Sequence, residues 1–221
     1  MAAGFLRRRH AGGFVDRDDA GHALAAALTT YADDPDLLVV GLARGGVPVA
    51  AVVADSLGAE LDVAVVRKLG LPGHEELALG AITRDRTVIN HRLVADLVLG
   101  QHDIDAILAR ERRELDRRES VYRSGRPGIA AVGRTVILVD DGVATGASMR
   151  VAVLAMRDAG AARVVVAVPT GPPSMIEDFR DEADDVVCVH TPRPFIAVGL
   201  SYRCFDQVSD TAVIAALGGG T

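Results

Sequence analysis

The sequence predicts a doubly wound α/β fold built on a mostly parallel sheet. Five short apolar runs alternate with helix-like segments along its 221 residues, of which 49% are hydrophobic. The runs at 37–42 and 136–139 are continuous rather than alternating with polar residues, as in strands buried on both faces of a parallel sheet. One run, 135–139, ends abruptly at two adjacent carboxylates, Asp140 and Asp141. Open α/β sheets bind their ligands at this carboxyl edge.

The amino-terminal half contains a strand–helix–strand unit. The apolar run 37–42 ends at the turn Ala43-Arg44-Gly45-Gly46. An alanine- and valine-rich segment then reaches Leu57, and Pro48 near its start suits the first turn of a helix. Residues 61–66 suit a second buried strand. A strand, a helix and a strand within about 30 residues make a βαβ unit, whose crossover is right-handed.

Residues 69–86 follow, with glycines and a proline among charged residues. Because this segment is longer than most connections and has weak periodicity, we expect a flexible lid. Residues 88–90 suit a short strand, and residues 103–122 a charged helix. Seven arginines lie between residues 110 and 126, but four acids interleave them. We therefore interpret this stretch as a solvated helix face rather than an anion site.

The carboxyl-terminal half continues the alternation. After the run 135–139, residues 147–159 suit a helix that ends at Gly160. The further expected elements are a strand at 163–169, a helix at 172–182 and a strand at 185–190.

Composition excludes several classes of protein. The net charge of −6 argues against general nucleic-acid binding. No apolar run is long enough to span a membrane, and no secretory signal is evident. Cys188 and Cys204 lack metal-ligand spacing and suit free thiols in a reducing compartment. We expect a cytoplasmic protein of one domain.

The segment 136–148 carries the strongest functional signal. After the two carboxylates, residues 142–148 offer backbone N–H groups and the hydroxyls of Thr145 and Ser148 at an expected helix start, which suits a phosphate. Carboxylates beside a phosphate would repel it unless a sugar lies between them. The acids would then accept from sugar hydroxyls while the loop holds the phosphate. The alternative is an acidic turn that only caps the next helix.

This segment resembles the signature of type I phosphoribosyltransferases, which bind 5-phosphoribosyl-1-pyrophosphate (PRPP). The match covers all thirteen positions, and Gly142 fits least well. The resemblance implies a five-stranded parallel core at about residues 30–190, a lid at about 69–86, and a small carboxyl-terminal hood at about 191–216. All would belong to one domain spanning residues 1–221.

The resemblance also implies roles for individual residues. Asp140 and Asp141 would accept from the ribose hydroxyls, directly or through Mg²⁺, which prefers hard oxygen ligands together with substrate phosphates. The 5-phosphate would lie on a loop made of Gly142, Val143, Ala144, Thr145, Gly146, Ala147 and Ser148.

A second anion site is expected for the pyrophosphate. The turn Ala43-Arg44-Gly45-Gly46 is similar to the pyrophosphate loop of the family, because glycines let successive N–H groups point at one anion. Lys68, the only lysine in the chain, closes the second strand and would bind the same group. Without the family context, the turn could be an ordinary connection between a strand and a helix. Arg67 and Lys68 could likewise be surface residues whose apolar stems lie along the protein while their charges reach solvent.

The lid and the hood supply weaker candidates. Glu75, Arg84 and Arg86 lie in the expected lid, where an arginine could close over the leaving group. Phe195 and Tyr202 could stack on an acceptor base, although either could equally belong to the core. The 6-oxopurine enzymes of the family carry an acid directly before the Thr-Gly of the signature, whereas this chain has Ala144. A hypoxanthine or guanine acceptor is therefore in doubt.

The function expected from the sequence is a Mg²⁺-dependent phosphoribosyltransferase of nucleotide metabolism. It would transfer the phosphoribosyl group from PRPP to a nitrogenous acceptor and release pyrophosphate. The expected partners are these small molecules, without membrane or nucleic acid, and a homodimer stays open. The alternatives are a non-catalytic sensor of PRPP or nucleotides on the same fold, and an enzyme that uses the ribose 5-phosphate site for another reaction.

Overall fold

The computed structural model describes residues 13–71, 74–97, 99–123 and 129–218. Its centre is a five-stranded, all-parallel sheet in the order β2-β1-β6-β7-β8. These strands are β1 (Leu37–Ala43), β2 (Glu60–Val65), β6 (Thr135–Val139), β7 (Arg163–Thr170) and β8 (Asp185–His190). The predicted fold class is thus confirmed. The expected strands begin and end within a residue of the observed ones.

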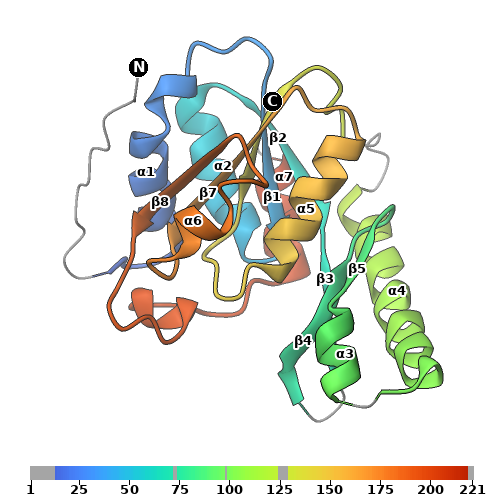
Figure 1. Ribbon diagram of the computed structural model, residues 1–221. Helices are drawn as coiled ribbons and strands as arrows, with labels where there is room; N and C mark the ends of the chain where they lie inside the picture. The colour runs from blue at the N-terminus through green and yellow to red at the C-terminus, as the bar shows by residue number, and fades with distance from the viewer. Residues whose placement is uncertain (1–12, 72–73, 98, 124–128, 219–221) are drawn as a thin grey trace.

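Helices cover both faces of this sheet (Figure 1). One face packs against α1 (Arg17–Ala27) and α2 (Gly46–Leu57), with Val39, Ile137 and Val165 among its buried strand residues. The other face packs against α5 (Ala147–Asp158) and α6 (Met175–Asp178). Alternate residues of each strand therefore enter opposite cores, which explains why the strands are mostly apolar.

The segment expected as a flexible lid forms a small antiparallel sheet rather than a loop. Its strands are β3 (Arg67–Leu71), β4 (His74–Ile82) and β5 (Thr87–Ile89), in the order β3-β4-β5. Leu69, Leu79 and Ile82 are buried in a third core. Gly80 allows β5 to pair closely, because a Cβ there would collide with the backbone of Val88. Polar residues and glycines hide the alternation in the sequence, so the expected loop was wrong.

Helices α3 (His91–Asp96) and α4 (Gln101–Arg123) pack with this sheet at one side of the molecule (Figure 1). The helix expected at residues 172–182 is only the short α6. After Asp178 the bonds are mixed: the amides of Arg180 and Glu182 donate to carbonyls three residues back, whereas the Ala183 amide donates four residues back, and the chain then turns into β8. The most deeply buried residues of this segment are Met175 and Phe179. A longer helix would therefore have few further apolar side chains to bury against the sheet.

Helix α3 was not predicted, and neither were α1, the short 3-10 helix η1 (Thr29–Tyr31) and α7 (Asp210–Gly218). The hood contains another 3-10 helix, η2 (Val198–Ser201), and is held to the amino-terminal segment. Phe14 donates its amide to the Ser201 carbonyl at 2.7 Å and accepts from the Arg203 amide at 2.9 Å. No helix in the described part of the chain has the length and apolarity needed to cross a membrane.

Candidate functional site

Three parallel strands end together at the carboxyl edge of the main sheet. In the register of the sheet, Gly41 of β1 pairs with Val139 of β6, and Ala43 pairs with Val65 of β2. The turn 43–46 and the two acids that follow β6 are therefore neighbours in space. Gly45 and Gly46 permit this approach, because a Cβ at Gly45 would collide with the Asp141 carboxylate.

The loop 142–148, here called the phosphate loop, presents unused donors at the start of α5. Gly146 has a φ of +77° and directly precedes the helix. Among the described residues, the backbone amides of 144–148 have no hydrogen-bond acceptor, and neither have the hydroxyls of Thr145 and Ser148. Val143 differs, since its amide donates to the Thr170 carbonyl at 3.0 Å. Free amides at a helix N-terminus are suited to an anion.

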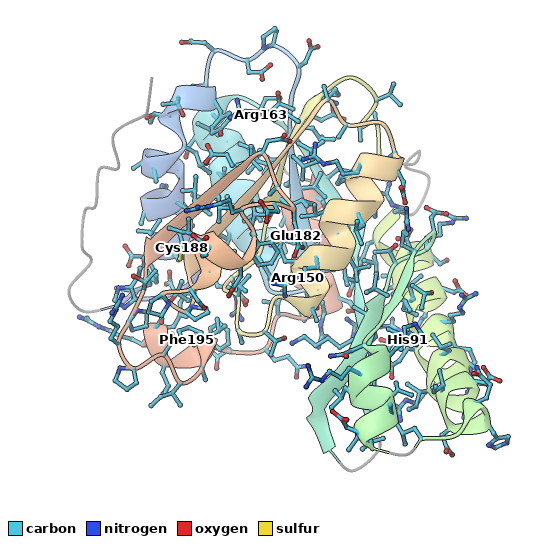
Figure 2. All side chains as sticks on the ribbon, in the orientation of Figure 1. His91, Arg150, Arg163, Glu182, Cys188 and Phe195 are labelled. Atoms are coloured by element: carbon cyan, nitrogen blue, oxygen red, sulfur yellow. The ribbon has the colours of Figure 1, made fainter. Side chains whose placement is uncertain are left out.

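Arg150 of α5 holds this loop in place, a role that the sequence did not suggest. Its Nη1 donates to the Thr145 carbonyl at 3.0 Å, and its Nε donates to Glu182 at 2.8 Å. The guanidinium also lies 4.8 Å from the centre of the Phe179 ring. Figure 2 shows Arg150 and Glu182 close together beside α5. These contacts fix the loop carbonyl, so the amides keep one orientation.

Asp140 and Asp141 form a tightly coupled pair of carboxylates. The Asp141 amide donates to Asp140 Oδ1 at 2.9 Å. Burial and the neighbouring Asp141 raise the pKa of Asp140 well above its usual range, although Lys68 and Arg17 oppose this. Asp140 Oδ2 and Asp141 Oδ1 have no partner among the described residues. Each acid therefore keeps one oxygen available for a ligand.

Arg17, the first residue of α1, completes the acidic pair and was missed by the sequence reasoning. Its Nε and Nη2 lie 2.8 and 2.7 Å from Asp141 Oδ2, and the two side chains are only 13% and 14% exposed. Its Nη1 donates to the Asp206 carbonyl at 2.8 Å, and its guanidinium covers the Phe205 ring at 4.0 Å. A separation of 124 residues left no local signal for this pair.

Replacing Arg17 by methionine should lower the free energy of unfolding by about 1.5–3 kcal/mol at pH 7, because Asp141 would keep a largely buried charge without its partner. Urea unfolding measures the change. In the double variant Arg17→Met with Asp141→Asn, most of the loss should be recovered. A double variant as unstable as the single one would contradict the assignment of the effect to this ion pair.

The expected pyrophosphate turn borders a pocket of about 690 Å³. Ala43, Lys68, Asp140 and Ser148 line it, so one pocket is bordered by the turn, the lysine, the first of the two acids and the phosphate loop. Lys68 is exposed and forms no ion pair with a described residue, whereas Arg67 is held by Glu111 at 2.5 Å. Arg44 lies 3.6 Å from Asp210 of α7, and its peptide bond to Ala43 is cis.

The three residues proposed for the lid lie in different places and have different neighbours. Arg84 and Arg86 are exposed near the turn between β4 and β5. Arg86 pairs with Asp158, at the opposite end of α5 from the phosphate loop. Arg84 lies near Glu119 of α4, whose pKa it lowers against the larger effect of burial. Glu75 belongs to β4, but its side chain falls outside the described residues. A contact of any of them with a leaving group stays a prediction.

The two hood candidates have different surroundings. Tyr202 is buried between Phe14 and Phe205, with ring centroids 5.5 and 4.8 Å away, and its hydroxyl donates to the Asp141 carbonyl. Burial and the neighbouring Asp141 raise its pKa. Tyr202 therefore braces the acidic pair, while Phe205 carries the more exposed ring. Phe195 is half-buried on the preceding segment (Figure 2). Stacking of Phe195 or Tyr202 on an acceptor stays a prediction.

The fold and the site together define an α/β protein with an anion-binding loop beside paired carboxylates at the carboxyl edge of its sheet. The chain belongs to the phosphoribosyl transferase domain family, whose model matches residues 17–203. The matched segment begins at Arg17 and includes both expected anion sites.

Known relatives agree with this assignment. Two inferred phosphoribosyl transferases of Mycobacterium tuberculosis, from strains CDC 1551 and H37Rv, are each 47% identical to 92% of this chain. The chain spans about half the length of these relatives, covering 46% of each. The crystal structure of TT1426 from Thermus thermophilus is 44% identical, with a TM-score of 0.76 over 93% of this chain and 97% of that one.

Proposed function

We propose that this protein binds PRPP and transfers its phosphoribosyl group to a nitrogenous acceptor, releasing pyrophosphate. The observation that carries the proposal is the phosphate loop, whose five free amides lie next to the paired carboxylates. Beside the acids, the pocket offers Lys68 without an ion-pair partner among the described residues. A phosphate, a ribose and a pyrophosphate could thus each meet groups of suitable charge.

Catalysis would depend on positioning and electrostatics. The phosphate loop would hold the 5-phosphate, and Asp140 and Asp141 would accept from the ribose hydroxyls. Bond cleavage at C1 leaves positive charge on the ribose and negative charge on the leaving pyrophosphate, as in glycoside hydrolysis. The nearby carboxylates would favour the first charge, and Lys68 and the amides of the turn 43–46 the second. The acceptor nitrogen would then bond to C1.

Mg²⁺ suits the donors of this site. The described residues contain no cluster of three or more metal-binding side chains. Asp140 and Asp141 each keep a free carboxylate oxygen, and Mg²⁺ is often held by one or two carboxylates together with substrate phosphates. Bound there, the ion would neutralise charge on the pyrophosphate. The two acids would hold it directly or through water or the ribose hydroxyls.

A screen of acceptors tests the proposal. Purines, pyrimidines and small amines would be incubated with PRPP and Mg²⁺ while the release of pyrophosphate is followed. We expect release that depends on one class of acceptor and is absent from the variant Asp140→Asn with Asp141→Asn. Intact PRPP binding without release for any acceptor would instead favour a PRPP sensor. Absence of PRPP binding would contradict both functions.

Lys68→Ala should distinguish the proposed pyrophosphate site from the proposed 5-phosphate site. Because only PRPP carries the pyrophosphate, its affinity should fall by about 10- to 100-fold, while the affinity for ribose 5-phosphate stays within about twofold. Isothermal titration with both ligands measures the difference. Arg92→Ala is a suitable control, since this cation is also exposed but lies on α3. Equal losses for the two ligands would remove Lys68 from the pyrophosphate site.

A further inference from the structure

Helix α4 forms one wall of the pocket at the pyrophosphate turn. Four of its residues line that pocket, namely Arg110, Glu111, Glu114 and Arg118. At about 690 Å³, the space falls within the range of small-molecule sites. One face of α4 is thus directed at the candidate site, contrary to the sequence-based interpretation of a solvated helix face. The expected role of its arginines changes accordingly.

The acids of this wall are already neutralised by arginines. Glu111 lies within 2.8 Å of both Arg67 and Arg110. Glu114 pairs with Arg117 and Arg118, each at 2.8 Å, and these hydrogen bonds lower its pKa to about 2. The lining as a whole holds four cations against three acids, one of which is Asp140. The pocket therefore favours an anion rather than a cation.

Arg118 is the residue of α4 that combines a mostly buried side chain with hydrogen-bond donors left free by the described residues. Its side chain is only 11% exposed, and its Nε donates to Glu114 at 2.8 Å. Its two terminal nitrogens, Nη1 and Nη2, have no acceptor among the described residues. They are not sealed in the protein, because the described part contains no fully buried side-chain nitrogen without a partner. Four N–H donors are thus held at the pocket wall.

Arg118 and Arg44 of the turn 43–46 both lie near the side chain of Tyr122. The charges of Arg118 and Arg44 both act on the hydroxyl of Tyr122, which donates to Asp210. Asp210 in turn accepts from Arg117 at 2.9 Å and lies 3.6 Å from Arg44. The carboxyl end of α4, the start of α7 and the turn therefore meet at one place. Arg118 and Ala43 of the turn both line the pocket there.

We propose that Arg118 is a further substrate-binding residue, which contacts the outer phosphate of a pyrophosphate held between α4 and the turn 43–46. The inference rests on the proposed function, since it assigns the anion in this pocket to the leaving group of PRPP. A planar guanidinium binds a phosphate through two parallel hydrogen bonds. The leaving group would thus be held by α4 as well as by Lys68. Arg110, which is more exposed, would lie farther along the same wall.

Titration of the full chain with inorganic pyrophosphate and, separately, with ribose 5-phosphate tests this role. Arg118→Gln should weaken pyrophosphate binding by about 10- to 100-fold and leave ribose 5-phosphate within about twofold. Arg113→Gln is the matched control, because this arginine of α4 is exposed and forms no ion pair with a described residue. It should bind both ligands as the unmodified protein does.

Glu114→Gln distinguishes ligand binding from a purely structural role. If Arg118 serves only to hold Glu114, the two variants should lose stability and pyrophosphate affinity to the same extent, which would overturn the proposal. If Arg118 binds the anion, Glu114→Gln should keep or increase pyrophosphate affinity, because a nearby negative charge has been removed. The thermal unfolding of each variant is measured as well, and a folded variant with an unchanged melting temperature excludes misfolding as the cause of a loss in pyrophosphate affinity.

The inference and the proposed function can fail separately. Unchanged pyrophosphate binding in Arg118→Gln, in a protein that binds both ligands before mutation, overturns the role of Arg118 alone. An unmodified protein that binds neither ligand contradicts the proposed function, and the inference falls with it.

Discussion

Replacing both Asp140 and Asp141 by asparagine should reduce Mg²⁺-dependent PRPP binding by at least about 100-fold. Each acid is proposed to accept hydrogen bonds from ribose hydroxyls or to hold the ion, and hydrogen bonds to charged groups contribute about 1.5–3 kcal/mol each. Titration calorimetry with PRPP and Mg²⁺ measures the loss. Asp33→Asn is a control on the exposed surface before β1, at the other edge of the sheet. Unchanged affinity would contradict the ribose assignment.

The single variant Asp140→Asn should lose this binding without losing stability. The pKa of Asp140 is raised in the folded protein by burial and by Asp141, so the ionised form is disfavoured there. The folded state then binds protons more strongly than the unfolded state, and this residue makes stability fall as the pH rises above the unfolded pKa. Asparagine removes that contribution and keeps an oxygen for the Asp141 amide. We expect a melting temperature at pH 7 equal to or above that of the unmodified protein.

Gly46→Ala should impair both folding and binding. An alanine Cβ at this position would lie 2.5 Å from the Val139 carbonyl oxygen and 2.8 Å from the Asp140 Cα. Both contacts are with backbone, so no side-chain rotation relieves them. The higher helix propensity of alanine contributes up to about 1 kcal/mol, whereas overpacking costs about 1–3 kcal/mol. The turn would have to move away from the acids.

Two measurements check this expectation. The urea midpoint should fall, and PRPP affinity should fall further than the change in stability alone explains, because the turn and Asp140 no longer share one geometry. Gly218→Ala is the control, since a Cβ there would meet no atom within 4 Å. A Gly46→Ala protein with an unchanged midpoint and unchanged PRPP affinity would show that the turn and β6 are less closely packed than described.

The main strands were predictable because their chemistry is local. Residues 37–42 and 136–139 are buried on both faces, so neither stretch has a polar side chain and each is visible as a run in the sequence. The small antiparallel sheet was not, because β3 and β4 contain glycines and charged residues that owe their strand conformation to pairing. The helix α7 was missed for a similar reason. Of its residues, only Val213 and Leu217 are buried, against other helices and strands.

The candidate site likewise contains residues that the sequence indicates and residues that only the folded structure reveals. The acids and the phosphate loop are contiguous in sequence, so their residue types point directly to a phosphorylated sugar. Arg17 and Arg118 lie 124 and 23 residues from Asp141, and each looks like an ordinary charge on a helix. Their roles depend on which face of α1 or α4 is turned toward the sheet edge. Packing of the whole helix decides that.

The parallel sheet and the loop at its carboxyl edge follow from the order of residues alone, because burial and backbone geometry restrict which residues can occupy neighbouring positions. The surroundings of that loop depend instead on how the whole chain folds. The tertiary structure places Arg17 against Asp141, closes one side of the pocket with α4, and covers the Tyr202 ring with Phe205. These contacts join segments far apart in the chain, and a charged or aromatic residue is equally compatible with solvent and with a partner until the fold brings that partner near.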